Sequence, residues 1–301
     1  MKKALSVAAL ALAMTGSALA ADLPHYKAPP PPPPPPPPMW TGFYVGLNAG
    51  GTWSNSNTFG ISTFAPSPFV PLTPFGVSAF NNLVVLGNGI LPINNSGFIG
   101  GGQIGYNWQF YNSFVAGVEA DIQGIASSNS TASAWLAAPT TLAGGPSVVG
   151  LSATKSLDYL GTVRGRLGWL FTPTLLVYGT GGLAYGGVRS SASIASFASL
   201  AGVGAPYPAF SNGAYSDTRV GWTAGGGLEW MFWPNWSAKV EYLYYDLGSV
   251  NYSAGVRVTT ELGTAVWGNI SQASTRYNGN IVRAGVNYHF NWGAPPVVAK
   301  Y

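Results

Sequence analysis

The chain has 301 residues, of which 7% are charged, 14% are aromatic and none is cysteine. A soluble domain usually carries about 25% charged residues, so we expect part of this surface to face a solvent other than water. The net charge of +4 comes without any basic run, so no nucleic-acid partner is expected. The lack of cysteine excludes disulfides and thiolate metal sites.

Residues 1–20 have the pattern of a secretory signal peptide. Lys2 and Lys3 precede an apolar run from Ala4 to Ala13, and Ala18-Leu19-Ala20 supplies the small residues of a cleavage site. An anchored helix is the alternative, but the run is shorter than the 18 or so apolar residues that a helical span needs. We therefore expect cleavage after Ala20 and export of the remaining chain.

Residues 21–39 form a proline-rich linker. The unbroken run Pro29–Pro38 cannot donate backbone hydrogen bonds or join a sheet, and as a polyproline II rod it would extend about 31 Å. It is either a stiff periplasmic arm that touches the peptidoglycan or, more plainly, a spacer.

The rest of the chain, residues 40–290, reads as strands. From Val282 to Phe290 every second residue is apolar, and the intervening positions include Arg283, Asn287 and His289. Such alternation gives a strand one apolar and one polar face. Eight segments of this kind are predicted: Trp40–Trp53, Ser96–Phe110, Phe114–Gln123, Leu157–Phe171, Leu175–Arg189, Thr218–Phe232, Trp236–Leu247 and Tyr277–Phe290.

The gaps between these segments alternate between short and long. Three are tight turns, at 111–113, 172–174 and 233–235, whereas 54–95, 124–156, 190–217 and 248–276 are long. An all-β, eight-stranded antiparallel transmembrane barrel has this pattern, with short periplasmic turns and long extracellular loops. An even number of strands places both termini in the periplasm. Residues 291–301 are then a C-terminal tail, and export indicates a bacterial outer membrane.

Nine charged residues share the inward parity of these strands. A lumen of eight strands is narrow enough for side chains to fill, and buried charges must be paired. We expect a nearly neutral salt-bridge network that plugs the barrel. The alternative is a gate or narrow ion path in which the pairs exchange partners. The residues are Glu119, Asp121, Arg164, Arg166, Arg219, Glu229, Lys239, Glu241 and Arg283.

Aromatic residues gather at the turn ends of the predicted strands. Tryptophan and tyrosine favour the membrane interface, where one part of the ring is apolar and the other is hydrated. This clustering predicts a lipid-facing girdle of Trp40, Trp108, Trp169, Trp230, Trp233, Trp236, Tyr288 and Phe290.

Three patterns that could indicate catalysis or cofactor binding have plainer explanations. Glu119 and Asp121 could act as an acid–base pair, but salt bridges explain them equally well. Gly100, Gly102 and Gly105 match the G-x-G-x-x-G pattern of dinucleotide-binding sites, but the helix that such a site requires does not follow. His25 and His289 have no second ligand at metal spacing. We predict no catalytic, cofactor or metal site.

Several stretches resemble a known family. Trp40–Gly51 (WTGFYVGLNAGG), Leu157–Trp169 (LDYLGTVRGRLGW), Tyr178–Gly187, Trp236–Gly248 and Val282–Phe290 are similar to strands of the small porin-family surface proteins of alphaproteobacteria. The resemblance implies an eight-stranded barrel and an abundant structural surface antigen, and some relatives are linked to haemin binding. Chains of this family usually end on the aromatic residue that closes the last strand, and the assembly machinery recognises this residue. Here residues 291–301 follow Phe290, so either Phe290 or Tyr301 could serve.

The sequence therefore predicts a structural outer-membrane surface protein that supports envelope integrity and is not an enzyme. Its expected partners are outer-membrane lipid, lipopolysaccharide and the barrel assembly machinery. A narrow porin-like channel, or haemin or ligand binding by the extracellular loops, is the alternative. A lipid-modifying enzyme is a third class, but it would need a Ser–His or Asp–His pair at the rim, and neither histidine lies in a loop.

Overall fold

A computed structural model describes residues 39–64, 84, 86–127, 130–138, 147–200, 203–260 and 263–290. At residues 138, 147, 198–200, 203–207, 256–260 and 263–270 only the backbone is described. The predicted signal peptide, all but the last residue of the linker, and the C-terminal tail lie outside these residues, so their boundaries stay predictions.

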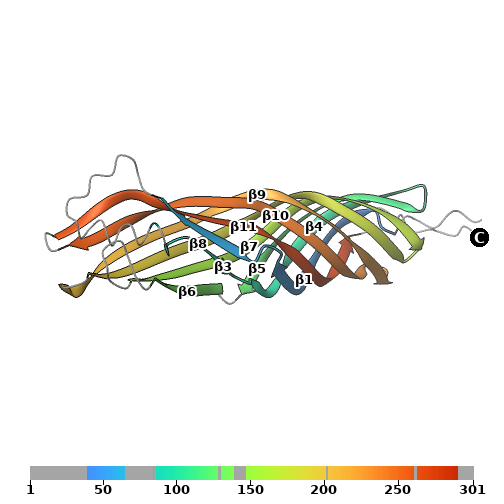
Figure 1. Ribbon diagram of the computed structural model, residues 1–301. Helices are drawn as coiled ribbons and strands as arrows, with labels where there is room; N and C mark the ends of the chain where they lie inside the picture. Colours follow the sequence, from blue (N-terminus) through green and yellow to red (C-terminus); the bar gives the residue numbers. More distant parts are fainter. Residues whose placement is uncertain are drawn as a thin grey trace, which may run out of the picture. The chain divides into compact units, whose positions relative to one another are not determined.

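Eight antiparallel strands pair side by side into a closed ring (Figure 1). The ring closes because the first strand pairs with the last, from Phe43↔Phe290 to Ser54↔Gly279. The predicted eight-stranded barrel is confirmed. Its strands are β1 (Gly42–Ser54), β4 (Ser96–Phe110), β5 (Phe114–Ser127), β7 (Ser147–Thr172), β8 (Leu175–Leu200), β9 (Val203–Trp233), β10 (Trp236–Thr260) and β11 (Gly263–Phe290).

The described residues contain no helix long and apolar enough to cross a membrane.

Three tight turns join the strands at one end of the ring, as the sequence predicts. They lie at 111–113, 173–174 and 234–235. In the first turn Tyr111 and Asn112 have φ angles of 49° and 58°. Asparagine tolerates this left-handed conformation because its short side chain bonds locally, whereas a tyrosine there is uncommon.

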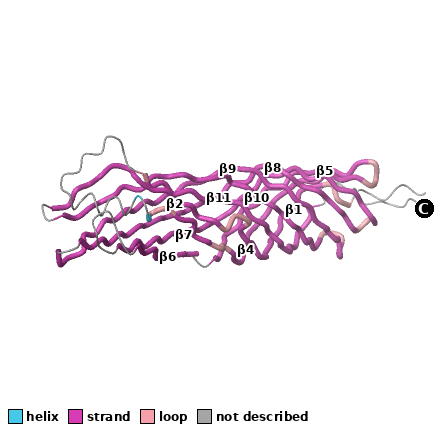
Figure 2. Tube along the Cα trace, in the orientation of Figure 1, coloured by secondary structure: helices cyan, strands magenta, loops and turns pink. Residues whose placement is uncertain are grey.

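At the other end the strands are longer than predicted. β7 has 26 residues and β9 has 31, so pairing continues through much of what the sequence analysis assigned to loops (Figure 2). The β8–β9 ladder runs from Leu175↔Trp230 up to Leu200↔Val203. Three further strands pair above the ring: β2 (Thr58–Thr63) with β11, β3 (Gly89–Pro92) with β2, and β6 (Ser130–Ala138) with β7. The predicted loop boundaries were therefore wrong, because backbone pairing extends beyond the amphipathic segments.

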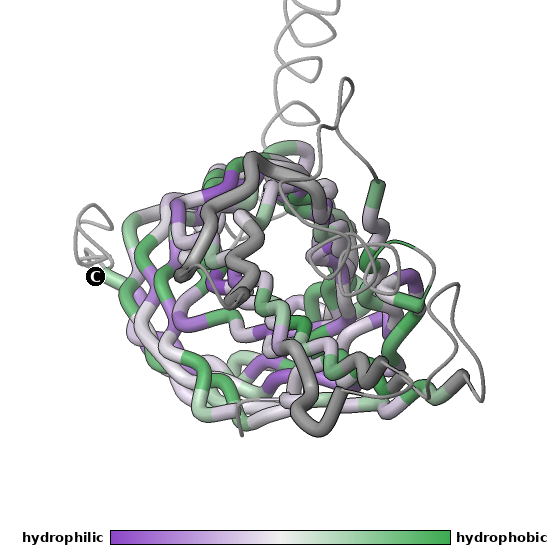
Figure 3. Tube along the Cα trace, turned by 60° about the vertical axis from the view of Figure 1, so that its left-hand side comes forward, coloured by the Kyte–Doolittle hydropathy of each residue, from purple (hydrophilic) through white to green (hydrophobic). Residues whose placement is uncertain are grey.

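The barrel has two parts. We call the turn end of the ring the membrane half. It consists of β1, β4 and β5 and of the part of each longer strand between the turns and residue 157 (β7), 188 (β8), 218 (β9), 247 (β10) or 277 (β11). The extracellular half is the rest of β7–β11 with β2, β3 and β6. Figure 3 shows hydrophilic and hydrophobic positions alternating along the wall. In the membrane half large apolar side chains such as Val163, Leu183 and Val220 point outward and are exposed, as a lipid-facing surface requires.

The interior is filled in layers. An apolar floor lies at the turn end, a charged layer follows, and a second apolar layer around Leu160, Leu243 and Ile281 lies above it. The extracellular half encloses a third apolar cluster: Phe59, Ile61, Leu91, Ile93, Val149, Leu151, Ala153, Ala192, Ile194, Ala209 and Ala273.

Candidate functional site

The charged layer is the candidate site. The structure brings together eight of the nine charged residues that the sequence assigns to the lumen, and their side chains are at most 2% exposed. They come from five strands, since inward parity on each strand aims at the same axis. The four acids and four bases balance: Glu119 and Asp121 on β5, Arg164 and Arg166 on β7, Glu229 on β9, Lys239 and Glu241 on β10, and Arg283 on β11.

Arg164 is the centre of the network. Its Nη1 donates to Glu241 Oε1 at 2.9 Å, its Nη2 donates to Asp121 Oδ2 at 3.0 Å, and Nη2 also contacts Glu119. Its Nε donates to Thr162 Oγ1 at 2.9 Å on the same strand. One guanidinium thus joins three carboxylates, which its planar fork of five donors allows.

Two further cations complete this tier. Arg283 Nη2 donates to Asp121 Oδ2 at 2.9 Å, and its Nε donates to Glu241 Oε2 at 2.8 Å. Lys239 Nζ lies 3.0 Å from each carboxylate oxygen of Glu119. Every carboxylate of the tier is shared between cations, which offsets the cost of removing these charges from water.

A second tier lies closer to the turns. Arg166 Nη2 donates to Glu229 Oε2 at 2.6 Å, and the guanidinium packs 4.1 Å from the centre of the Tyr178 ring. The Tyr44 hydroxyl accepts from Arg166 Nη1 at 3.0 Å and donates to Glu119 Oε2 at 2.7 Å. Tyr44 therefore connects the two tiers.

Sequence reasoning missed several polar members of the network. Tyr178 donates to Glu241 at 3.0 Å, and Ser237 and Asn287 donate to Glu229 at 2.6 and 2.7 Å. Ser237, Asn287 and the buried His289 all stand on faces that the alternation marks as polar, so that signal was available. Tyr178 gave none, because the glycine-rich segment Leu175–Arg189 has no clear parity.

Arg219 was wrongly assigned to the network. The β9–β10 ladder stops at Trp222↔Asp246 and resumes only at Asn212↔Gly255. Arg219 lies in this interval, ten residues above Glu229. It is half-exposed, and its Nη2 donates to the Ser249 carbonyl at 3.2 Å instead of to a carboxylate.

Trp40 was wrongly assigned to the aromatic girdle. It precedes β1, and its side chain is fully buried. The indole Nε1 donates to the Pro173 carbonyl at 3.0 Å, and the ring meets His289 edge-on at 5.7 Å. It is part of the apolar floor with Val115, Leu170, Leu176, Tyr178 and Met231.

The other girdle residues lie on the outside at the turn end. Trp108, Trp169, Trp230, Trp233 and Trp236 are 42–67% exposed. Tyr288 and Phe290 are partly exposed and pack edge-on against each other at 5.1 Å. Tyr288 also contacts Trp236, so the belt is continuous across β10 and β11.

The other sequence patterns lie in the barrel wall or above it. Gly100, Gly102 and Gly105 are in the middle of β4, where no helix follows. Among the tyrosines of the predicted extracellular loops, Tyr215 and Tyr252 stack with ring centres 6.1 Å apart, and the side chain of Tyr207 is not described. Within the described residues no three His, Asp or Glu side chains could hold a metal ion.

A closed ring of eight antiparallel strands, apolar outside and charged inside, with a tryptophan belt at the turn end, defines a β-barrel of the outer membrane. A model of the outer membrane protein beta-barrel domain matches residues 6–290, and the chain belongs to this family. It is an outer-membrane protein.

Two relatives by sequence agree with this assignment. The 31 kDa outer-membrane immunogenic protein of Brucella melitensis is 34% identical over 96% of this chain and 100% of its own length. The 22 kDa outer membrane protein of Rhizobium leguminosarum is 30% identical over 52% of this chain and 59% of its own. The outer membrane protein OprG of Pseudomonas aeruginosa is 10% identical, with a TM-score of 0.37 over 83% of this chain and 96% of that one.

Proposed function

We propose that this protein is a structural component of the outer membrane whose lumen is plugged by the charged layer. The observation that carries this proposal is the balance of four buried acids against four buried bases across five strands. A network of this kind holds the strands together and leaves no free charge to attract an ion.

The layers around the network support the same conclusion. A hydrated ion that passed the apolar floor would lose its water, and it would then have to displace ion pairs such as Arg164–Glu241. A second apolar layer follows above. Since an unpaired buried charge costs many kcal/mol, this sequence of layers opposes conduction.

We extend the surface-antigen role to this chain from its relative in Brucella, whose name describes an immunogenic protein. The extracellular half supports this because its outer face carries exposed serine and glutamine side chains, among them Ser62, Ser193, Ser253 and Gln272. Such a face remains soluble outside the bilayer and is available to antibodies.

Osmotic swelling of proteoliposomes tests the plug against a narrow channel. The refolded protein should allow no arabinose-driven swelling, whereas a general porin at equal density should allow rapid swelling. Swelling above that of protein-free vesicles would contradict the plug and favour the porin-like alternative.

A deletion strain tests the structural role. Loss of the protein should increase uptake of a hydrophobic dye such as N-phenylnaphthylamine, and the wild-type gene should restore the barrier. Unchanged dye uptake would contradict a role in envelope integrity. Haemin binding stays a prediction, and a titration without a Soret shift would remove it.

A further inference from the structure

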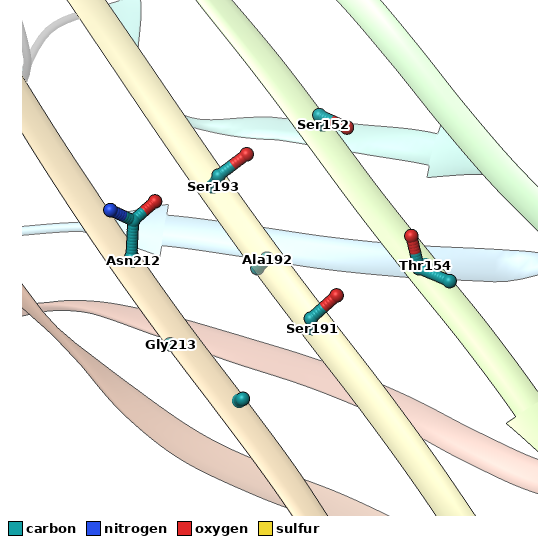
Figure 4. Close-up of a pocket in the computed structure, with 8 residues that line it drawn as sticks. Ser152, Thr154, Ser191, Ala192, Ser193, Asn212 and Gly213 are labelled. Carbon is teal, nitrogen blue, oxygen red and sulfur yellow. The ribbon is translucent and has the colours of Figure 1, made fainter.

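A groove crosses the outer wall of the extracellular half over β7, β8 and β9 (Figure 4). Its upper part is a cavity of about 480 Å³, and its lower part is one of about 320 Å³. The two are continuous, because Thr154, Ser191 and Ala214 line both. The groove is separate from the charged layer, which lies inside the membrane half.

The upper part is lined by short polar side chains. Figure 4 shows Ser191, Ser193 and Thr154 with their hydroxyls on one side of the strands, and Asn212 adds an amide. Ala192 has the opposite parity and is buried in the extracellular core. Hydroxyls and amides both donate and accept, so this surface matches a ligand rich in hydroxyl groups.

The lower part adds charge and a serine hydroxyl that is open to the groove. Arg189 and Asp158 form an ion pair at 2.9 Å, and the arginine side chain is 68% exposed. Ser156 pairs with Arg189 across β7 and β8 and is only 8% exposed. It lines the groove, and among the described residues its hydroxyl makes no hydrogen bond. A hydroxyl that faces a groove beside an exposed guanidinium can donate to an anionic oxygen.

An aromatic pair closes the upper end. Phe210 is the next outward residue beyond Asn212, and it meets Phe197 edge-on with ring centres 6.0 Å apart. Both rings are more than one third exposed. Exposed rings at the end of a hydroxyl-lined groove offer an apolar surface for the C–H face of a sugar.

The position of the groove selects the ligand. On β8 the exposed Leu183 is followed on the same face by the partly exposed Tyr185, a residue type that favours the membrane interface, and Arg189 lies four residues above Tyr185. The groove therefore opens sideways above the hydrocarbon, where the saccharides of neighbouring lipids can reach it. We propose that it binds the phosphorylated core saccharide that complete lipopolysaccharide carries beyond lipid A, in the same leaflet, with Arg189 and Ser156 on a phosphate of that core and Ser191, Ser193 and Asn212 on sugar hydroxyls.

The cysteine-free chain allows a direct test by thiol labelling. Ser193→Cys places one thiol in the groove, and Ser62→Cys places a matched thiol on β2. Ser62 is also exposed. It pairs with Gln272 of β11, which in turn pairs with Ser253 of β10, so Ser62 and Ser253 lie at a similar height on the wall. Each full-length variant is refolded into vesicles of phospholipid alone, phospholipid with lipid A, or phospholipid with complete lipopolysaccharide. Heat-dependent gel mobility confirms folding, and the rate of maleimide labelling is measured.

Complete lipopolysaccharide should slow labelling of Ser193→Cys by about tenfold, as expected for a site about 90% occupied. Lipid A should slow it much less, and the rate at Ser62→Cys should stay the same in all three membranes. Adding Arg189→Gln to Ser193→Cys should remove most of the protection. Equal slowing at both thiols, equal slowing by lipid A, or full protection without Arg189 would overturn the proposal.

Discussion

The two halves of this barrel have opposite polarity: the membrane half is polar inside and apolar outside, and the extracellular half is apolar inside and polar outside. In the membrane half β7 turns Arg164 and Arg166 inward and Val163 and Leu167 outward. Above it the same strand turns Val149 and Leu151 inward, whereas Ser152 and Thr154 line the outer groove. The pairing with β8 continues, but a register shift between Leu157 and Tyr159 moves the inward face of β7 from even-numbered to odd-numbered residues. The polar residues of the strand therefore pass from the lumen to the outer wall where the surrounding solvent changes.

This reversal shows how the solvent determines what the lumen contains. Hydrocarbon accepts the apolar face of the membrane half, so the polar residues must satisfy one another inside. Outside the bilayer water accepts the polar face, and the interior becomes an ordinary apolar core. The protein is thus a membrane barrel that continues into a water-soluble one.

The largest expected effect is the loss of a charge from the membrane half. Arg164→Leu leaves Glu119, Asp121 and Glu241 short of a partner, which should lower the free energy of unfolding by about 3–5 kcal/mol. Urea titration in lipid vesicles, followed by tryptophan fluorescence, measures it. The matched change Arg189→Leu removes an exposed pair and should cost about 1 kcal/mol or less. Similar losses for both variants would contradict the buried network.

Truncating a leucine should have a large effect only where that leucine packs against protein. Leu151 is 2% exposed in the extracellular core, so Leu151→Ala should cost about 2–5 kcal/mol. Leu167 is 62% exposed to lipid, and Leu167→Ala should cost much less, because lipid fills the space. The same denaturation measurement compares them, and the reverse order would show that the extracellular half has no packed core.

An added arginine tests the outer faces. Val163→Arg places a charge in the lipid-facing band and should destabilise the protein by about 2–4 kcal/mol. Ser62→Arg adds the same side chain to the water-facing wall and should change stability by about 0.5 kcal/mol at most. If both variants lose equal stability, the boundary between the halves has been placed wrongly.

The smallest expected effect is a pH dependence in the extracellular half. Lys155 Nζ is buried, donates to the carbonyls of Ser56 and Arg276 at 3.1 and 2.6 Å, and lies 4.9 Å from the centre of the Tyr277 ring. Burial lowers the pKa of Lys155 to about 8. The unfolded chain, with its ordinary pKa near 10.4, binds more protons above pH 8, so stability should rise with pH.

Between pH 7 and 9 this rise should be about 1 kcal/mol, and Lys155→Met should remove it. The window stays below pH 9 because burial raises the pKa of Tyr252, whose ionisation acts in the opposite direction at higher pH. A wild-type stability that falls across this window, or an unchanged slope in the variant, would show that Lys155 is not buried as described.

The membrane half could be predicted well because lipid imposes a strong alternation. Arg164, Glu229 and Arg283 stand opposite large apolar neighbours, which fixed their parity and brought them to one lumen. Arg219 has the same local pattern, but the break in the β9–β10 ladder is a tertiary feature that the alternation does not record. Trp40 looked like an interface residue because no pattern shows that the chain before β1 turns into the floor.

The extracellular half was harder to predict because its alternation has little contrast. The stretch Ser190–Ala198 mixes serine with alanine, isoleucine and phenylalanine without strict alternation, and many of these side chains are small. Small residues bury little area on either face, so the sequence resembles a loop even though its backbone pairs in register with β7 and β9. These strands are extended by backbone pairing that continues from the ring below. The local sequence pattern does not extend them.

The most direct test of the account is single-channel recording of the wild-type protein in a planar bilayer. If the balanced charges and the two apolar layers close the lumen, the folded protein should give no stable open level above the bare membrane. A steady, porin-sized conductance from protein with the heat-shifted mobility of the folded barrel would contradict the closed interior.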